Sequence, residues 1–403
     1  MRLVTVAVGV LLLGSLLGVA YLGVGDGGAE LSEEWVSDTE RNVRANHHSV
    51  AVADGRVYAP VSAESRSTGC ALVALDASDG STDWSYGVAA ANCTIHAVAD
   101  PTVADYDADE TNEVLAATTE NELAAFVPET GEKEFAKELT KYGYTKPLVA
   151  DLAPAEGREL IVADSGGVVF VVDSAGETVW SHDLDAFVWA QPAVADFDAD
   201  GDPELVVAGD DGNVTLFDAD GAVEWQRNVG GSITWGTTGD IDNDAARETV
   251  VATSRGDVVA LDGSGSEEWR LNVGRFAAVE AVADTDDDGR QELYVTARDG
   301  ALRRVDAATG EVVWATDLTA ESVQMMPPPV VGDVDGDGDP ELVVAGNDGT
   351  VSVVSPEGEV RATYSRDVPV FARPTLADLD GDGDDEALVM YADGRVVALD
   401  YDE

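Results

Sequence analysis

Short acidic stretches with aspartate at alternate positions recur along this chain of 403 residues, and DFDADGDPE, residues 196–204, is representative. Its carboxylates stand at the first, third, fifth and ninth positions, and Gly201 stands at the sixth. Calcium takes about six to eight oxygen ligands, and a tight acidic loop supplies several of them from neighbouring residues. Glycine at the sixth position suits the sharp turn that such a loop requires. The stretch therefore favours a calcium site.

Four stretches follow the complete pattern D-x-D-x-D-G-x-x-E. Their expected ligands are Asp196, Asp198, Asp200, Glu204, Asp284, Asp286, Asp288, Glu292, Asp333, Asp335, Asp337, Glu341, Asp378, Asp380, Asp382 and Glu386. Two more loops keep the four acids but carry Glu110 or Ala245 in place of the glycine, so weaker calcium binding is expected there. Their acids are Asp105, Asp107, Asp109, Glu113, Asp240, Asp242, Asp244 and Glu248. A seventh loop, at Asp151, has Ala153 and Ala155 at alternate positions and is expected to be metal-free.

The overall charge offers a second explanation for this acid. Asp and Glu number 79 against 23 Lys and Arg, which gives a formal net charge of -56. Such a charge destabilises a compact fold by self-repulsion, which molar salt screens. The composition is therefore typical of a folded protein from a high-salt environment, and acidic loops can also be plain solvated surface. No basic patch is available to neutralise phosphates, so we expect no nucleic-acid partner.

The spacing of the loops separates these two explanations. Their first aspartates are Asp105, Asp151, Asp196, Asp240, Asp284, Asp333 and Asp378, separated by 46, 45, 44, 44, 49 and 45 residues. Acidic residues scattered by chance would not recur at a regular spacing along the chain. Each unit also holds four short, alternating, valine-rich segments bounded by Asp-Gly or Asn-Gly turns, which is the pattern of antiparallel hairpins. Four strands in a repeat of this length predict the blades of a β-propeller.

The ends of the chain predict the number of blades. The chain finishes with a third strand at residues 394–403 and has no fourth strand after it, whereas residues 31–38, LSEEWVSD, read like the fourth strands of other units. We therefore expect an all-β, eight-bladed propeller of four-stranded antiparallel blades over residues 26–403, closed by residues 31–38. A glycine before each expected fourth strand is followed four positions later by an aromatic residue in most units, such as Trp225 after Gly221, and these aromatics are expected to pack between blades.

Two family resemblances accompany this pattern. The units with acidic loops resemble the FG-GAP/VCBS repeats of extracellular propellers, whose hairpin loops hold calcium. The segments CALVALDASDGSTDW (residues 70–84) and LRRVDAATGEVVW (residues 302–314) resemble the PQQ-like repeat of quinoprotein-type propellers. Together these resemblances imply the fold over nearly all of the chain from Glu34 onward. They imply little about activity, because propellers host unrelated functions.

The first residues form a separate segment. Residues 3–24 carry no charge and are long enough to cross a bilayer as a hydrophobic helix, with Arg2 on the inner side. Residues 1–25 are thus a membrane anchor or a cleaved signal peptide, for which 18–20 is a passable cleavage site. Either way we expect the propeller outside the cell, held to the cell membrane by one anchor or secreted. Export permits a disulfide between Cys70 and Cys93, and two unpaired buried thiols are the alternative.

Catalytic residues are hard to assign. Cys70 and Cys93 are not the adjacent cysteines typical of quinone dehydrogenases, and the only histidines are His47, His48, His96 and His182. A histidine pair just before a first strand is more often solvated than bound to metal, so we expect no site at His47 and His48. A binding or scaffold module for a protein or polysaccharide is therefore favoured over a PQQ-like or polysaccharide-acting enzyme.

An apolar ring is the candidate partner surface. Seven residues before the first aspartate of successive loops, or close to that position, stand large apolar residues that would crowd the channel mouth if the first strand is innermost. They are Tyr144, Trp189, Trp235, Met326 and Phe371. We expect them either to bind a partner on the face opposite the calcium loops or to plug the channel as core.

Overall fold

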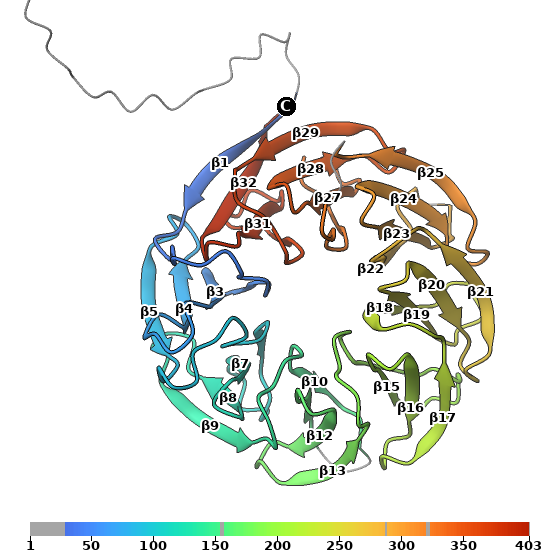
Figure 1. Ribbon diagram of the computed structural model, residues 1–403, viewed down its shortest axis with the longest axis horizontal. Coiled ribbons are helices and arrows are strands. Elements are labelled where there is room, and N and C mark those ends of the chain that lie inside the picture. Colours follow the sequence, from blue (N-terminus) through green and yellow to red (C-terminus); the bar gives the residue numbers. More distant parts are fainter. Residues whose placement is uncertain (1–28, 154–156, 287, 320–322, 403) are drawn as a thin grey trace, which may run out of the picture.

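A computed structural model describes residues 29–153, 157–286, 288–319 and 323–402. Within these ranges the chain forms 32 strands and no α-helix. The strands make eight four-stranded antiparallel sheets, which stand as blades around a central axis (Figure 1). The expected all-β, eight-bladed propeller is confirmed.

The innermost strand of each blade is short in most units. These strands are β2 (Ala51–Ala53), β6 (Thr102–Ala104), β10 (Leu148–Ala150), β14 (Ala193–Ala195), β18 (Ile233–Gly239), β22 (Ala278–Ala283), β26 (Val330–Gly332) and β30 (Thr375–Ala377). The second strands are β3 (Arg56–Val61), β7 (Glu113–Thr118), β11 (Glu159–Ala163), β15 (Glu204–Ala208), β19 (Glu248–Thr253), β23 (Glu292–Thr296), β27 (Glu341–Ala345) and β31 (Glu386–Met390).

The two outer strands of each blade complete it. The third strands are β4 (Ala71–Asp76), β8 (Glu122–Phe126), β12 (Val168–Asp173), β16 (Asn213–Phe217), β20 (Asp257–Leu261), β24 (Ala301–Asp306), β28 (Thr350–Val354) and β32 (Val396–Asp402). The outermost strands are β5 (Thr82–Gly87), β9 (Lys133–Glu138), β13 (Thr178–Asp183), β17 (Val223–Asn228), β21 (Glu267–Asn272), β25 (Val312–Asp317), β29 (Val360–Ser365) and β1 (Glu30–Val36).

Burial explains the composition of these strands. The second strands are buried along their whole length, as in β15, except at Arg56 of β3, because neighbouring blades cover both of their faces. Such strands read as continuous apolar runs. The outermost strands alternate between exposed and half-buried residues, as in β13, because one face meets solvent. The hydrophobic core therefore consists of layers between successive blades.

The eighth blade combines the two ends of the described chain. Its strand order is β1-β32-β31-β30, and β1 runs antiparallel to β32 with Trp35 opposite Ala398. Figure 1 shows β1 as the outer strand beside β32, close to the carboxyl terminus. At the hub, Ser49 donates a hydrogen bond to the Arg373 carbonyl (3.1 Å) and Thr375 to the Val50 carbonyl (3.0 Å), which joins the first and eighth blades.

A contact between tryptophan and glycine repeats from blade to blade. The indole Nε1 of Trp225 donates to the Gly263 carbonyl of the next blade at 2.8 Å, and a Cβ on Gly265 would lie 2.7 Å from that indole ring. Gly265 also has a positive φ of 76°. Glycine is needed there for both reasons. The expected packing of these aromatics between blades is thus observed, and Trp35 makes the same contact with Ala77 and Gly80 of the first blade.

The expected N-terminal hydrophobic helix, within residues 1–25, lies outside the described residues. Among the residues that the structure does describe, no helix is long and apolar enough to cross a membrane.

Candidate functional site: acidic loops and a hub cavity

The acidic loop at Asp196 is a tight turn organised around its carboxylates. It connects β14 to β15, and the backbone N–H of Gly201 donates to Asp196 Oδ2 at 3.0 Å. The N–H of Phe197 donates to Glu204 Oε2 at 2.8 Å, while the Phe197 ring is buried beneath the loop. Asp196 Oδ1 is buried and has no hydrogen-bond partner. A buried carboxylate oxygen of this kind is costly unless something positive meets it.

The same hydrogen bond recurs in all seven loops. In each, the residue after the first aspartate donates its N–H to the glutamate that opens the second strand; the donors are Tyr106, Leu152, Phe197, Ile241, Thr285, Val334 and Leu379. That bond uses one carboxylate oxygen of the glutamate and fixes the direction of the other. The acidic loops that recur in the sequence therefore also share one local hydrogen-bond geometry.

Burial raises the pKa of the last glutamate in five of the loops. It raises the pKa of Glu113, Glu204, Glu248, Glu341 and Glu386 to about 7, against the opposing effect of the backbone N–H bond. Burial favours the uncharged form of a carboxyl group, and a nearby cation would favour the charged one.

The donor set of these loops fits a calcium ion. Oxygens of the first, third and ninth residues lie within 4.8 Å of one another in the loops at Asp105, Asp196, Asp240 and Asp284. Carboxylate oxygens in this number suit a hard cation. Asp196, Asp198 and Glu204 would hold the ion in the representative loop, and the unpartnered Asp196 Oδ1 is the observation that supports the fit. In the Asp333 loop the sixth residue, Gly338, donates its N–H to Asp333 as Gly201 does to Asp196. In the Asp378 loop the fourth residue, Gly381, donates its N–H to Asp378.

The two loops without glycine at the sixth position adopt the same tight turn, but with backbone strain at that residue. Glu110 and Ala245 adopt positive φ angles of 75° and 80°, and each donates its N–H to the first aspartate of its loop at 3.2 and 3.3 Å. Left-handed backbone is strained for residues with a Cβ. The structure therefore gives a physical reason for expecting weaker binding at these two loops.

The acids of the loop at Asp284 contact an arginine side chain from a neighbouring strand. Arg304, from β24, places Nη2 2.5 Å from Asp286 Oδ2 and 2.9 Å from Glu292 Oε1. Its hydrogen bond lowers the pKa of Asp286. Other units carry small or apolar residues at this point of the third strand, namely Ala125, Val171, Leu216, Ala260, Val353 and Ala398. The sequence pattern of the loop alone could not reveal this arginine, since it lies on another strand.

At Asp151 the turn is arranged differently. Leu152 and Ala153 both donate their N–H to Glu159 Oε2, at 2.9 and 3.1 Å, and the Ala153 side chain is buried. The alanine side chain has no oxygen that could serve as a ligand. Residues 154–156 lie outside the described residues.

The five residues of the expected apolar ring meet at the hub. Tyr144, Trp189, Trp235, Met326 and Phe371 all line one cavity of about 560 Å³. Trp189 is 40% exposed, whereas Met326 is 2% exposed and belongs to the core. The ring of Trp189 packs edge-on against Tyr144, with centroids 5.1 Å apart. The innermost strands begin beside this cavity and end at the acidic loops, so the two candidate sites lie at opposite ends of these strands.

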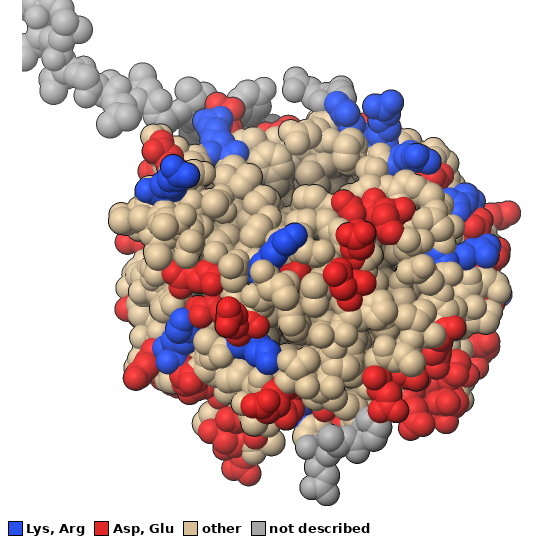
Figure 2. Space-filling model, turned by 60° about the horizontal axis from the view of Figure 1, so that its bottom comes forward, with Lys and Arg blue, Asp and Glu red and all other residues tan. Residues whose placement is uncertain are grey.

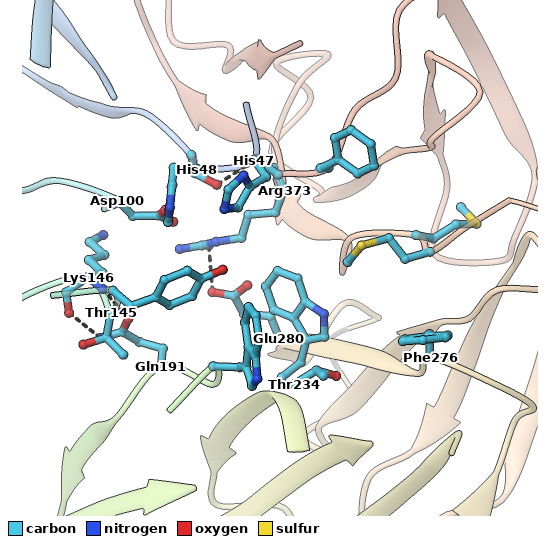
Figure 3. A pocket seen from close by; sticks show the side chains of 18 of the residues that line it. His47, His48, Asp100, Thr145, Lys146, Gln191, Thr234, Phe276, Glu280 and Arg373 are labelled. Carbon is cyan, nitrogen blue, oxygen red and sulfur yellow. Dashed lines mark hydrogen bonds and ion pairs between the residues drawn. The ribbon is translucent and has the colours of Figure 1, made fainter. Parts of the chain in front are cut away.

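Charged residues outside the expected apolar ring line the same cavity. Arg373 Nη1 lies 2.9 Å from Glu280 Oε1, and Glu280 Oε2 is buried without a partner. Burial raises the pKa of Glu280 and lowers that of Lys146. Figure 3 shows Asp100, Lys146, Glu280 and Arg373 directed into one space. A signal existed: Asp100, Lys146 and Arg373 each stand five residues before the first aspartate of a loop.

Three histidines line one wall of the cavity. His48 is 4% exposed and its Nδ1 lies 2.7 Å from Asp100 Oδ1, while His47 Nε2 lies 3.0 Å from His96 Nδ1. Burial lowers the pKa of His47 to about 3 and that of His96 to about 4. The expectation that His47 and His48 are merely solvated was wrong, because the segment before β2 folds inward over the hub. His96 is brought to them by the fold from a distance of 48 residues along the chain.

The two cysteines form a disulfide, Cys70–Cys93. Cys70 precedes β4, and Cys93 lies in the connection from β5 to β6. The N–H of Arg66 donates to the Cys93 carbonyl at 3.0 Å, so the disulfide also holds the loop at residues 62–69. Of the two states that the sequence left open, the structure has the bonded one.

Acid covers the surface around these sites. Figure 2 shows clusters of Asp and Glu over the visible face, with Lys and Arg more sparsely placed among them. Most of the ion pairs are arginine–carboxylate contacts at partly exposed positions, such as Arg395 with Glu40 at 2.5 Å. Pairs of this exposure add little to stability.

The fold and its two sites define the class as an eight-bladed β-propeller with periodic acidic hairpin loops and a hub cavity lined by aromatic and charged residues. Residues 28–153 and 140–288, together more than half of the chain, match the family model described as outer membrane protein assembly factor BamB. The chain belongs to this family. Residues 333–389 match the FG-GAP-like repeat. Both resemblances drawn from the sequence are confirmed.

Solved structures agree on the fold. The crystal structure of BamB from Moraxella catarrhalis has a TM-score of 0.62 at 19% identity, covering 92% of this chain and 97% of that one. The computationally designed Ika8 protein gives a TM-score of 0.62 at 15% identity, covering 92% and 99% of the two chains. BBS1N in complex with ARL6DN gives 0.53 at 15% identity, covering 74% and 90%. No curated protein sequence matches the chain.

Proposed function

We propose that this protein is an exported, calcium-stabilised propeller at the cell surface, whose hub cavity binds a segment of a partner protein. The observation that carries the proposal is the cavity itself. It combines exposed aromatic surface, led by Trp189, with charged lining groups that include Glu280 and Arg373. Binding sites typically join apolar walls to a few well-placed polar groups. The matched family, described as an outer membrane protein assembly factor, favours a protein partner over a polysaccharide.

The location follows from the first residues of the chain. The uncharged run at residues 3–24 would hold the propeller to the membrane by a single anchor, with the propeller outside, or would be removed as a signal peptide. The Cys70–Cys93 disulfide supports an oxidising compartment, since such bonds persist outside the cytosol.

Partner binding is tested with a matched pair of variants. Trp189→Ala removes an exposed aromatic side chain from the cavity, whereas Val313→Ala removes a side chain that is 58% exposed on the outer strand β25. A photo-crosslinking residue at Thr234, which also lines the cavity, reports what is bound in native-salt membranes. We expect Trp189→Ala to abolish crosslinking to protein and Val313→Ala to leave it unchanged, with both variants melting as the parent does.

Three outcomes would contradict this function. Equal crosslinking in both variants would remove the cavity from the interaction. Recovery of carbohydrate instead of protein would favour a polysaccharide partner. A fall in melting temperature with crosslinking intact would make Trp189 a core residue.

Calcium at the acidic loops is the second part of the proposal. We expect the loops at Asp196, Asp333 and Asp378 to bind most tightly, and those at Asp105 and Asp240 more weakly because of their strained sixth residue. An ion at about ten times its Kd stabilises the folded state by about 1.4 kcal/mol per site. Chelation at constant molar salt should therefore lower the melting temperature, and identical melts with and without calcium would refute the idea.

A pair of variants within one loop assigns the effect. Asp196→Asn changes the carboxylate with the unpartnered buried oxygen, whereas Asp202→Asn changes an exposed acid in the same loop whose N–H donates to Asp200. We expect only Asp196→Asn to reduce the number of calcium ions bound. An equal reduction in both would indicate a general charge effect.

A polysaccharide-acting enzyme is the second candidate. Its support is Glu280, a cavity carboxyl group whose pKa is raised by burial, as suits a general acid. Hydrolysis or elimination of acidic cell-surface polysaccharide that disappears in Glu280→Gln would favour this candidate. The PQQ-like resemblance leads to a further assay, because absorbance changes and sugar or alcohol oxidation with added pyrroloquinoline quinone would indicate a quinoprotein enzyme.

A further inference from the structure

Three imidazoles from two segments meet on the cavity wall. His47 and His48 come from the segment before β2, and His96 comes from the connection before β6. The ring centroid of His47 lies 4.4 Å from that of His48 and 4.8 Å from that of His96. One nitrogen from each ring lies within 4.8 Å of the other two.

Neighbouring oxygens fix which nitrogens are available. His47 Nδ1 lies 2.7 Å from the Ala45 carbonyl, which can only accept a hydrogen bond, so Nδ1 carries the proton and Nε2 of the neutral ring is bare. His48 Nδ1 lies 2.7 Å from the Asp100 carboxylate, which by the same logic leaves His48 Nε2 bare. Histidines that bind metals usually donate their other N–H to a carboxylate or a carbonyl in this way.

Within the protein, the unprotonated nitrogens have few hydrogen-bond partners other than one another. His48 Nε2 is buried and has no hydrogen-bond partner. His47 Nε2 faces His96 Nδ1 at 3.0 Å, which needs a proton on His96 to be a hydrogen bond. A core cluster held by hydrogen bonds alone would therefore leave one buried nitrogen unsatisfied, which is costly. The tautomer that the Ala45 carbonyl selects for His47 is a neutral imidazole, the form that binds a metal.

We propose that His47, His48 and His96 bind one divalent transition-metal ion of the zinc class, with a further coordination position open to the hub cavity. The geometry points to Nε2 of His47, Nε2 of His48 and Nδ1 of His96 as the ligand atoms, with the His96 proton moved to its Nε2. Asp100 acts as a positioning residue through His48. The site goes beyond the proposed function and is independent of the calcium loops, because its ligands are nitrogen rather than oxygen.

The chemistry of the wall fits such an ion. Neutral imidazole suits zinc, copper, iron and nickel, whereas calcium prefers oxygen. Three histidines with an open position are typical of sites that bind water or a ligand at the metal. The Tyr144 ring packs edge-on against His48 and His96 at 5.3 and 5.4 Å and shields this side of the cluster. The ion would give the cavity an anchor for a carboxylate or imidazole of a bound molecule.

Cobalt is the direct probe, because its visible spectrum depends on its ligands. The protein, purified without a histidine tag, is titrated with Co²⁺ at molar salt and in excess calcium, which saturates the acidic loops. We expect an intense visible absorption of a four- or five-coordinate nitrogen site that saturates at one equivalent and is abolished by Zn²⁺. If the titration gives no more than the weak absorption of octahedral cobalt, the proposal is overturned. This result does not depend on whether any variant folds.

Variants assign the ligands. His96→Ala should lose the cobalt absorption, while His182→Ala should retain it, since His182 is the remaining histidine and lies on β13 against Phe217. Asp100→Asn should keep the spectrum but weaken Zn²⁺ binding by about 10- to 100-fold, as expected when the partner of a ligating histidine is removed. Equal loss in His96→Ala and His182→Ala, or an unchanged spectrum in His96→Ala, would overturn the assignment.

Discussion

At the scale of single residues, one side chain on a neighbouring strand decides what an acidic loop can bind. The loop at Asp284 has the complete calcium pattern, yet the guanidinium of Arg304 already contacts Asp286 and Glu292. A positive group at the centre of the acids meets the same electrostatic need as a metal ion. We propose that Arg304 takes the place of calcium in this loop.

The variant Arg304→Leu tests this substitution. Leucine is the residue at the corresponding position beside the Asp196 loop, Leu216, so the change fits the surrounding packing. We expect one additional calcium ion per protein by equilibrium dialysis. Arg303→Leu is the control, because Arg303 pairs with Asp299 instead of the loop. An unchanged calcium count in Arg304→Leu would show that Arg304 does not take the place of calcium in this loop.

At the scale of strands, the blades are joined by contacts that repeat around the ring. Each tryptophan on an outer strand donates its indole N–H to the next blade; Trp35, on β1, donates to the Ala77 carbonyl at 2.9 Å just as Trp180 donates to Ala219 at 3.1 Å. An amino-terminal strand that completes the last blade removes an exposed sheet edge. We infer that β1 contributes to stability like any internal outer strand.

Trp35→Ala measures that contribution. Because Trp35 is 7% exposed, its loss should lower the free energy of unfolding by about 3 kcal/mol, similar to other large-to-small core changes. Glu34→Ala, on the exposed side of the same strand, should leave stability unchanged. Denaturant unfolding at fixed salt and calcium is the measurement. Deletion of residues 31–38 with cooperative melting intact would disprove the inferred role of β1.

The disulfide links two connections at the first blade. Closing a loop between Cys70 and Cys93, which are 23 residues apart, restricts the unfolded chain and adds about 3 kcal/mol in the chain-entropy account. The double variant Cys70→Ser, Cys93→Ser should melt at a lower temperature than the parent. A reductant should lower the melting temperature of the parent and leave the double variant unaffected. Equal melting of both proteins would show that the bond has no stabilising role.

At the scale of the whole molecule, charge sets the conditions in which the propeller is stable. A net charge of -56 on one compact ring produces strong self-repulsion. Raising salt from about 0.1 M to about 1 M shortens the Debye length from about 10 Å to about 3 Å. We therefore expect the melting temperature to rise over this range at constant calcium. A flat or falling dependence would contradict the interpretation of the composition as an adaptation to high salt.

Repetition made most of the fold predictable from sequence. The period of the acidic loops, the Asp-Gly turns and the tryptophan–glycine spacing are local features, and local features dictate hairpins and blades wherever they occur. The five residues of the apolar ring were also predictable, because residues at the same or a neighbouring position of each unit lie at a similar distance from the axis.

Only the tertiary structure decided what meets at the hub and inside the loops. His96 joins His47 and His48 because the ring brings consecutive blades together at its axis, and no spacing along the chain encodes that contact. Arg304 reaches the Asp284 loop across a strand, and Glu280 meets Arg373 across the cavity. Sequence patterns fix what lies next to what within a hairpin. The tryptophan contacts between successive blades follow the sequence period, whereas contacts across the hub depend on how the blades are arranged around the axis.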